Sequence, residues 1–566
     1  MLSPNATDES LGANQVTNSF GVTDIRDDPE GQLPTPSFLG GNSIISVTRE
    51  GSLQPSIQRE RCTAFETGIF PLLGMDMTTP QTTSSSTQQN QPRHPNSSLP
   101  DAREMIVLFN FYRHRVHPFQ FVLDDVDEIE RSMCSLINGD MEAPQCDAHF
   151  LGLMHAIFSL GAQFSDLAPT VRVPKYQKHL KHALSLLGTF DYLWNPSKRL
   201  IQTFLILGHV LQNDMNPRAA WILGGTTIRL ALSVGLHQPE SIARSIRISP
   251  AEAQNLRLAI VWQDTLLSLA FDQPPASQMM DIGSDLPALA REGGSGVELT
   301  YRQAMNWICH LALRYLSAPS DTTSKERYHE IFQAFDALQR SVAPHLKSQT
   351  KCCSIQEIQE HHSLELHANC VLSTLCRPIL SRAVKRAVGE DVSSRILERF
   401  QESLKRSVCA LIRLRSISSH STRSWAFVHN GLSSALLLSF IKGAKATEDT
   451  RKIQAKLIQS LTETHEDVGQ LSIAHKKALK ALQALQKLAE DDVANESATR
   501  EEEGQESTNN QDEVAISHEN PSDFQDPSTF EMDDWLRTFE FDSFSPLDAY
   551  NFIMSDQILP ETGFKG

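Results

Sequence analysis

The sequence contains no run of five lysines and arginines, no apolar stretch approaching about 20 residues, and no regularly spaced cysteines. Because there is no such basic run, the sequence gives no indication of a nucleic-acid-binding arm. The lack of a long apolar stretch argues against a membrane span. Nine scattered cysteines, an odd number, predict reduced thiols in an intracellular protein rather than a disulfide framework. The N-terminus also lacks the basic start and apolar run of a signal peptide.

The negative charge is concentrated near the C-terminus. The formal net charge is −17, and residues 491–566 hold 20 acidic residues against three basic ones. Residues 1–490 hold 48 of each and are neutral. The bulk charge therefore indicates no basic surface for DNA, and the acidic end would repel the phosphate backbone.

Composition divides the chain into three parts. Residues 1–100 are rich in Ser, Thr, Gln, Asn, Gly and Pro, and we expect them to be disordered because they offer little for a core to bury. Residues 101–490 carry apolar residues at helical spacing, and no stretch alternates long enough to indicate a sheet. Residues 491–566 are predicted to be a disordered acidic tail. The predicted fold is all-α: a multi-helix domain flanked by two disordered segments.

Breaks at proline and glycine set the predicted helix boundaries. The predicted helices span 103–115, 125–138, 149–164, 173–191, 196–213, 217–234, 250–271, 298–316, 325–342, 355–375, 392–416, 424–442 and 444–490, the last with a break near 464–469.

The helix predicted at 217–234 is the easiest to interpret. Asn216 is expected to cap it and Pro217 to occupy its first position. Gly235 is expected to end it in the left-handed conformation, with Leu236 as the apolar contact. The paired glycines of its apolar stripe predict close approach by another helix, with the tryptophan buried at the crossing. That stripe consists of Trp221, Gly224, Gly225, Ile228 and Leu232.

The same segment resembles the signature of the fungal transcription factor regulatory domain, the middle homology region of binuclear zinc-cluster regulators. Its matching residues are Trp221, Gly224, Ile228, Arg229, Leu230, Ala231, Leu232, Gly235, Leu236 and His237. Residues 111–121 resemble the opening element of that family through Tyr112, Val116, His117, Pro118 and Phe119. Residues 366–380 resemble its later helix, which ends at Arg377 and Pro378. In order and spacing, the resemblance covers residues 103–440.

This resemblance implies a nuclear, non-enzymatic transcriptional regulator of a fungal metabolic pathway, such as a secondary-metabolite gene cluster. It assigns no catalytic, cofactor-binding or metal-binding residue, and it suggests pairing with itself or with a zinc-cluster factor. The DNA reader of the family is a block of six cysteines, whereas only Cys62 precedes Cys134 here. Three explanations remain open: a DNA-binding partner, a lost reader, or a gene model that lacks its first exon.

The acidic end has the composition of a transactivation segment. In residues 521–566, nine aromatic residues are interleaved with acidic ones. This segment holds too few aliphatic residues to form a core of its own. Residues 531–544 are predicted to fold into a short helix in a coactivator groove. The predicted anchors are Trp535, Leu536, Phe539, Phe541 and Phe544. A solubilising tail is the alternative.

Two further patterns are candidates for metal sites. The DDxxE string at 124–128 is typical of Mg²⁺ ligands in all-α terpene synthases, but the second metal motif is absent and acids are common in a first helical turn. His361, His362, His367 and Cys370 lack the i, i+4 spacing of a helical zinc site and are predicted to be structural. The remaining hypotheses are a regulator, an adaptor or antagonist that pairs with a zinc-cluster factor without binding DNA, and a metal-dependent all-α enzyme, which is disfavoured.

Overall fold

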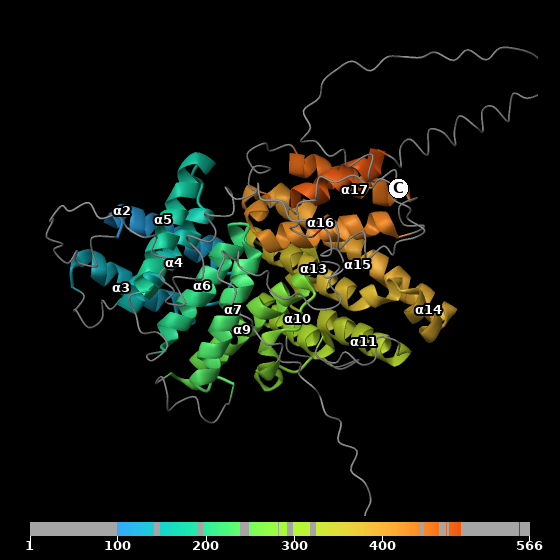
Figure 1. Ribbon diagram of the computed structural model, residues 1–566, viewed down its shortest axis with the longest axis horizontal. Helices are drawn as coiled ribbons and strands as arrows, with labels where there is room; N and C mark the ends of the chain where they lie inside the picture. The colour runs from blue at the N-terminus through green and yellow to red at the C-terminus, as the bar shows by residue number, and fades with distance from the viewer. Residues whose placement is uncertain are drawn as a thin grey trace, which may run out of the picture. The chain divides into compact units, whose positions relative to one another are not determined.

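The computed structural model describes residues 99–140, 148–188, 196–237, 248–280, 282–290, 298–316, 324–441, 447–462, 471, 475–487 and 554 (Figure 1). All of them belong to one compact unit, Ser52–Gly566. The segments predicted to be disordered, 1–100 and 491–566, lie outside the described residues except for residues 99, 100 and 554. The predicted break near 464–469 also lies outside them.

The described chain is a succession of helices, and the all-α prediction is confirmed. In order they are α2 (Ala102–Phe111), η4 (Tyr112–Val116), α3 (Val126–Asn138), α4 (Ala148–Gln163), α5 (Pro169–Gly188), α6 (Lys198–Asn213), α7 (Pro217–Ser233), α9 (Pro250–Phe271), η5 (Ala276–Met279), η6 (Gly283–Asp285), α10 (Tyr301–Leu316), α11 (Lys325–Ser341), α12 (Pro344–Lys347), η8 (Gln349–Lys351), α13 (Ile355–Cys376), η9 (Arg377–Leu380), α14 (Arg382–Val388), α15 (Glu390–Ile417), η10 (Ser419–Arg423), α16 (Trp425–Phe440) and α17 (Glu448–Thr462). Residues 475–487 are also helical. The one departure from helices and loops among the described residues is an isolated parallel bridge between Leu299 and Val342.

Local capping explains why most predicted boundaries fall within a few residues of the observed ones. Ser249 and Glu252 form a reciprocal capping box at the start of α9, and Gly139 ends α3 with a φ of 78°. The start of α5 differs from the prediction, since the helix begins at Pro169 instead of Val173 and carries Pro174 inside it. Both prolines suit a first helical position, and the structure uses the earlier one.

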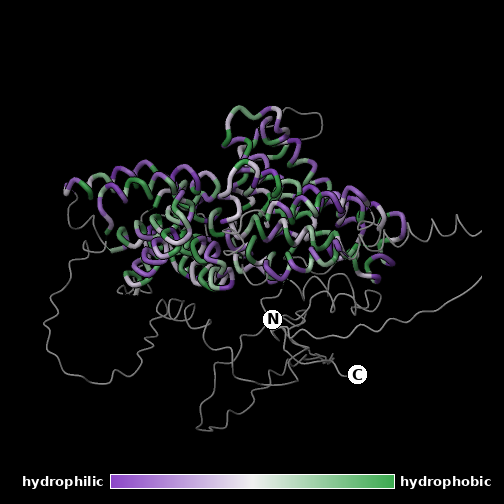
Figure 2. The backbone as a smooth tube through the Cα atoms, turned by 90° about the horizontal axis from the view of Figure 1, so that it is seen from above, coloured by the Kyte–Doolittle hydropathy of each residue, from purple (hydrophilic) through white to green (hydrophobic). Residues whose placement is uncertain are grey.

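Two hydrophobic cores organise the helices. The first core is formed chiefly by α2 to α9, and the second chiefly by α10 to α17 together with residues 475–487. Trp262 and Leu266 of α9 pack against both cores, and we call the region around them the seam. Figure 2 shows hydrophobic and hydrophilic residues alternating along most helices, as expected where one helix face is buried. By contrast, α4 is buried on all sides from Phe150 to Gln163, and α6 likewise from Leu200 to Gln212, so both lie deep in the first core.

The end of α7 follows the prediction, and its start follows it in part. Gly235 has a φ of 80°, and the N–H of Leu236, which is fully buried, donates to the carbonyl of Ala231 at 3.0 Å. Pro217 begins the helix as predicted. The Asn216 side chain, however, makes no capping hydrogen bond, so the predicted side-chain cap is wrong.

The packing predicted for the middle of α7 is also wrong. A Cβ atom placed on Gly224 or Gly225 would meet no atom within 4 Å, so no helix approaches closely there. Trp221 is half-buried, and its indole N–H donates to Ser268 Oγ of α9 at 3.2 Å. The buried stripe is shifted by about one position and contains Ala220, Leu223, Gly224, Thr227, Ile228 and Ala231.

The cysteines and the apolarity of the helices can be compared with the predictions from the sequence. All seven cysteines that the structure describes are free thiols. Among the described helices, none combines the length and the apolarity that crossing a membrane requires.

Candidate functional site

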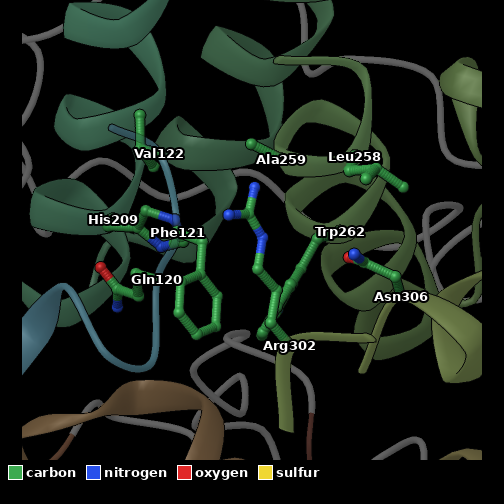
Figure 3. Close-up of a pocket in the computed structure, with 9 residues that line it drawn as sticks. All are labelled: Gln120, Phe121, Val122, His209, Leu258, Ala259, Trp262, Arg302 and Asn306. Carbon is green, nitrogen blue, oxygen red and sulfur yellow. The ribbon is translucent and has the colours of Figure 1, made fainter. Parts of the chain in front are cut away.

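Two adjoining hollows lie at the seam. The larger, which we call the seam cavity, has a volume of about 80 Å³ and is lined by residues of η4, α6, α9, α10, α13 and α16. The smaller has a volume of about 10 Å³, close to the space for one water molecule. Gln120, His209 and Trp262 border both (Figure 3). A concave space between two cores, with apolar walls and a few polar groups, is the usual setting of a small-molecule site.

Four aromatic rings form the wall that joins the two cores. The Phe121 ring lies 6.0 Å from Trp262 and 6.3 Å from Tyr301, measured between ring centroids. Phe119 contacts the same Tyr301 ring edge-on at 5.7 Å. Each such pair contributes about 0.5–1.5 kcal/mol beyond the area it buries. The segment after η4 therefore ties the opening of the first core to the start of α10.

Arg302 is the cation of the seam. Figure 3 shows its side chain lying between the rings of Phe121 and Trp262. Its guanidinium carbon lies 5.0 Å from the Phe121 ring centroid, and Nη2 donates to Asn255 Oδ1 at 2.7 Å. Burial lowers the pKa of Arg302, an effect that Asp124 opposes, yet a guanidinium stays charged at neutral pH. No carboxylate of the described residues lies at ion-pair distance from Arg302, whose guanidinium contacts the Phe121 ring and the Asn255 amide.

Polar atoms without partners also border the seam cavity. Gln120 Oε1 and Asn213 Nδ2 are buried and have no hydrogen-bond partner within the described structure. His209 is buried too, and burial lowers its pKa to about 4, so its imidazole is neutral at neutral pH. An acceptor, a donor and a neutral imidazole thus border one cavity. Leaving such groups unsatisfied costs free energy that a ligand can recover.

The family-motif residues do not line the seam cavity. Trp221 packs against Phe271 of α9 at 6.3 Å between ring centroids, and Arg229 is exposed on α7. His237 is half-buried just after α7. Arg377 and Pro378 begin η9 at the end of α13, the boundary that the sequence predicted. The predicted activation anchors Trp535, Leu536, Phe539, Phe541 and Phe544 lie outside the described residues.

Sequence reasoning missed the residues that do line the seam. Trp262 and Arg302 are separated from Phe121 by well over a hundred positions, and no local motif links them. The available signal was the Phe-Gln-Phe run that follows His117 and Pro118. Its two phenylalanines alternate with a polar residue in a short loop, a pattern that indicates contacts with other elements.

The acidic string at 124–128 has structural partners. Asp124 accepts hydrogen bonds from Lys198 Nζ and Gln202 Nε2, both at 2.9 Å. Asp125 caps α3 by accepting the N–H of Glu128 at 2.8 Å. These contacts support the interpretation as an acidic helix start rather than a metal-binding string.

The histidines of α13 divide between two places. His361 and His362 lie close to Glu365, whereas His367 faces Asn430 across to α16, with His367 Nδ1 and Asn430 Nδ2 3.2 Å apart. The four candidate ligands of the sequence pattern therefore do not come together. The group with Glu365 is balanced by Arg413, whose guanidinium lies 3.9 Å from the carboxylate.

Two comparisons identify the kind of protein that this chain resembles. Residues 135–292, from α3 to the segment that follows η6, match the family described as fungal specific transcription factor domain. The chain is also 24% identical over 263 residues to a protein of Penicillium rubens named sorbicillinoid biosynthetic cluster transcription factor 2. That alignment covers 43% of this chain and 37% of the relative, so the chain spans well under half of the relative's length. The resemblance inferred from the sequence is confirmed, and the matched family segment builds most of the first core.

Proposed function

From the fungal specific transcription factor domain of residues 135–292, we propose that this chain is a nuclear, non-enzymatic transcriptional regulator that responds to a small ligand. The observation that carries the proposal is the position of the seam cavity between this domain and the second core. The relative's name supports control of a secondary-metabolite gene cluster. The family match supports a role in transcription rather than catalysis.

The lining of the seam cavity favours a small carboxylate with an apolar body. Trp262, Phe119 and Tyr301 offer apolar ring faces, and Arg302 at the smaller hollow offers a charge that suits a carboxylate. A ligand there touches α9 of the first core as well as α13 and α16 of the second. It therefore biases any equilibrium between two arrangements of the cores by its difference in affinity for them.

The acidic end supplies the output. Aromatic anchors such as Trp535 and Phe539 would enter a coactivator groove, where each fully buried large side chain contributes about 1.5–3 kcal/mol. The interleaved acids add attraction at a distance and keep the segment soluble. The pairing with a zinc-cluster factor that the family resemblance suggests would bring this output to DNA.

The output is tested by fusing the chain to a heterologous DNA-binding domain and measuring a reporter gene. The wild-type fusion is expected to activate, and Trp535→Ala with Phe539→Ala to abolish most of that activation. Asp533→Asn with Asp534→Asn, the matched pair of charge changes, is expected to weaken it only partly. An inert fusion at normal nuclear level contradicts the activator and favours the adaptor that pairs without activating.

The ligand is tested on the purified chain with benzoate and its uncharged analogue benzamide. Benzoate is expected to raise the melting temperature and benzamide to have little effect. Arg302→Leu is expected to remove the response, whereas Arg229→Leu, which changes an exposed arginine on α7, is expected to keep it. An equal response of the two variants would place the carboxylate elsewhere.

A further inference from the structure

Three histidines meet between α4 and α5 in the first core, away from the seam cavity. His155 of α4 is 0% exposed and His179 of α5 is 2% exposed, while His182 sits half-buried one turn further along α5. The Nδ1 atoms of His155 and His179 are 3.1 Å apart. One ring nitrogen from each of the three histidines lies within 4.8 Å of those of the other two.

Hydrogen bonding within this cluster leaves one ring nitrogen unsatisfied. The facing Nδ1 atoms of His155 and His179 share a single proton, since one must donate and the other accept. The Nδ1 atom of His182 is buried and has no hydrogen-bond partner within the described structure. A polar atom in that position needs a partner that the surrounding protein does not offer.

The imidazoles are in the protonation state that metal binding requires. Burial, with smaller contributions from the neighbouring histidines and from Lys178, lowers the pKa of His155 to about 3. Burial, followed by Lys178 and His182, lowers the pKa of His179 to about 4. The rings are therefore neutral at neutral pH, the state in which an imidazole binds a metal ion, and the proton shared by the two Nδ1 atoms would move to an Nε2 atom when the ion binds. The nearby positive charges are weak opponents, because Lys178 is exposed and Lys175 is paired with Glu104.

We propose that His155, His179 and His182 form a binding site for a zinc-class divalent metal ion. Zn²⁺ binds imidazole nitrogens at about 2.0–2.1 Å in tetrahedral geometry, which places its ligand atoms about 3.3 Å apart. The pair formed by His155 and His179 already has nearly that separation. His182 reaches it by moving up to about 1.5 Å, which its place at the half-buried rim allows.

Three nitrogen ligands leave the fourth position open to water or to an anion. The ion bridges the buried helix α4 to α5, so it braces the part of the chain that matches the fungal transcription factor family. Imidazole nitrogens without carboxylates suit Zn²⁺ and related late first-row ions and disfavour Mg²⁺ or Ca²⁺.

A second group of histidines in the described structure, on α13, serves as a comparison for the α4–α5 site. His361 and His362 lie near Glu365, but His361 Nδ1 already faces the Leu346 carbonyl at 3.0 Å. Glu365 lies beside Arg413, so its charge is already balanced. Both ring nitrogens of the buried His362 lack a hydrogen-bond partner within the described structure. The contrast therefore rests on His361, which already has a partner, and on the positive charge of Arg413 beside Glu365, and for these two reasons this group is expected to hold no ion.

The test uses the full chain, stripped of metal with a chelator and then titrated with Co²⁺ and Zn²⁺. Co²⁺ is expected to give the visible absorption of a four-coordinate ion without the near-ultraviolet charge-transfer band that thiolate ligands produce. Zn²⁺ is expected to displace it at one equivalent and to raise the melting temperature. A cobalt spectrum with a thiolate band, or no visible band at all, overturns the proposal.

Matched variants locate the ion. His182→Ala at the rim is expected to weaken Zn²⁺ binding by at least about 10–100-fold, the loss seen when even an outer partner is removed. His361→Ala is expected to keep the affinity of the wild type. Circular dichroism of the metal-free variants shows whether each one folds. A folded His182→Ala protein that binds Zn²⁺ as tightly as the wild type also overturns the proposal.

Discussion

Each core contains a helix crossing at a glycine, yet the two crossings differ in what the glycine faces. In the first core, a Cβ atom on Gly161 of α4 would lie 2.1 Å from the backbone carbonyl oxygen of Leu108 in α2. In the second, a Cβ atom on Gly431 of α16 would lie 2.2 Å from Cδ2 of Leu411 in α15. A backbone oxygen is fixed by its helix, whereas a leucine methyl group can rotate away. Similar clashes should therefore have very different consequences.

The glycines of α7, which belongs to the first core, differ from both Gly161 and Gly431. Gly224 and Gly225 face open space, although their sequence context made them the best candidates for a close crossing. The comparison teaches that a glycine in a helix identifies a tight contact only when the neighbouring element is known.

The largest effect is expected from Gly161→Ala. The added methyl group meets a backbone atom that cannot move without shifting α2 against α4, so the variant should lose about 3 kcal/mol or more of unfolding free energy. Chemical denaturation followed by circular dichroism measures the loss. Gly152→Ala on the same helix is the control, because a Cβ atom at Gly152 meets nothing within 4 Å. Equal stability of the two variants would contradict the close α2–α4 contact.

Acidification should destabilise the protein through one buried histidine from each core at the seam. His209 of α6 and His367 of α13 both line the seam cavity, and burial lowers the pKa of each to about 4. Between pH 6.5 and 4 the unfolded chain takes up a proton at each position that the folded chain refuses. Stability is therefore fully present above pH 6.5 and falls on acidification, by roughly 3 kcal/mol per histidine.

The variants His209→Gln and His367→Gln each remove one of these titrating groups. Each variant should reduce the number of protons taken up on unfolding between pH 6.5 and 4 by close to one. The slope of the unfolding free energy against pH, measured by denaturant titrations at several pH values, gives that number. A slope unchanged in both variants would mean that neither histidine is held neutral by burial.

The helices could be predicted from the sequence but the seam could not. The reason is how far apart along the chain the interacting residues lie. Boundaries such as Ser249 at α9 and Gly235 after α7 depend on hydrogen bonds within a few residues, which the sequence displays. The short helices α12 and α14, of 4 and 7 residues, were missed because they hold too few turns for a periodic pattern.

The candidate sites depend on contacts between distant segments. Phe121 meets Trp262 and Tyr301 only after the cores have assembled, and His155 meets His179 only because α4 packs on α5. The histidines of α13 stand out in the sequence because they lie within seven positions of one another. Sequence spacing favours residues on one helix, whereas the α4–α5 group combines two helices.

A moderate effect is expected from Gly431→Ala in the second core. The methyl group meets the Leu411 side chain, which can change its rotamer, so the loss should be about 1–2 kcal/mol. Leu411→Ala alone should cost about 2–5 kcal/mol through the cavity that it leaves. The double variant should lose less than the sum of the two, because the clash and the cavity cancel in part. Strict additivity in denaturant titrations would mean that the two residues do not touch.

The smallest effect, of opposite sign, is expected from Gly224→Ala. The new methyl group meets no atom within 4 Å, and alanine is favoured over glycine inside a helix by up to about 1 kcal/mol. It also restricts the unfolded chain more than glycine does. The variant should therefore be slightly more stable than the wild type, whereas a tight crossing at this position would make it less stable. Gly225→Ala, also in open space, should behave in the same way, and thermal unfolding of the two variants beside Gly161→Ala measures the contrast directly. A loss of stability in both would restore the crossing that the sequence motif predicted and would require α9 to lie closer to α7 than the structure places it.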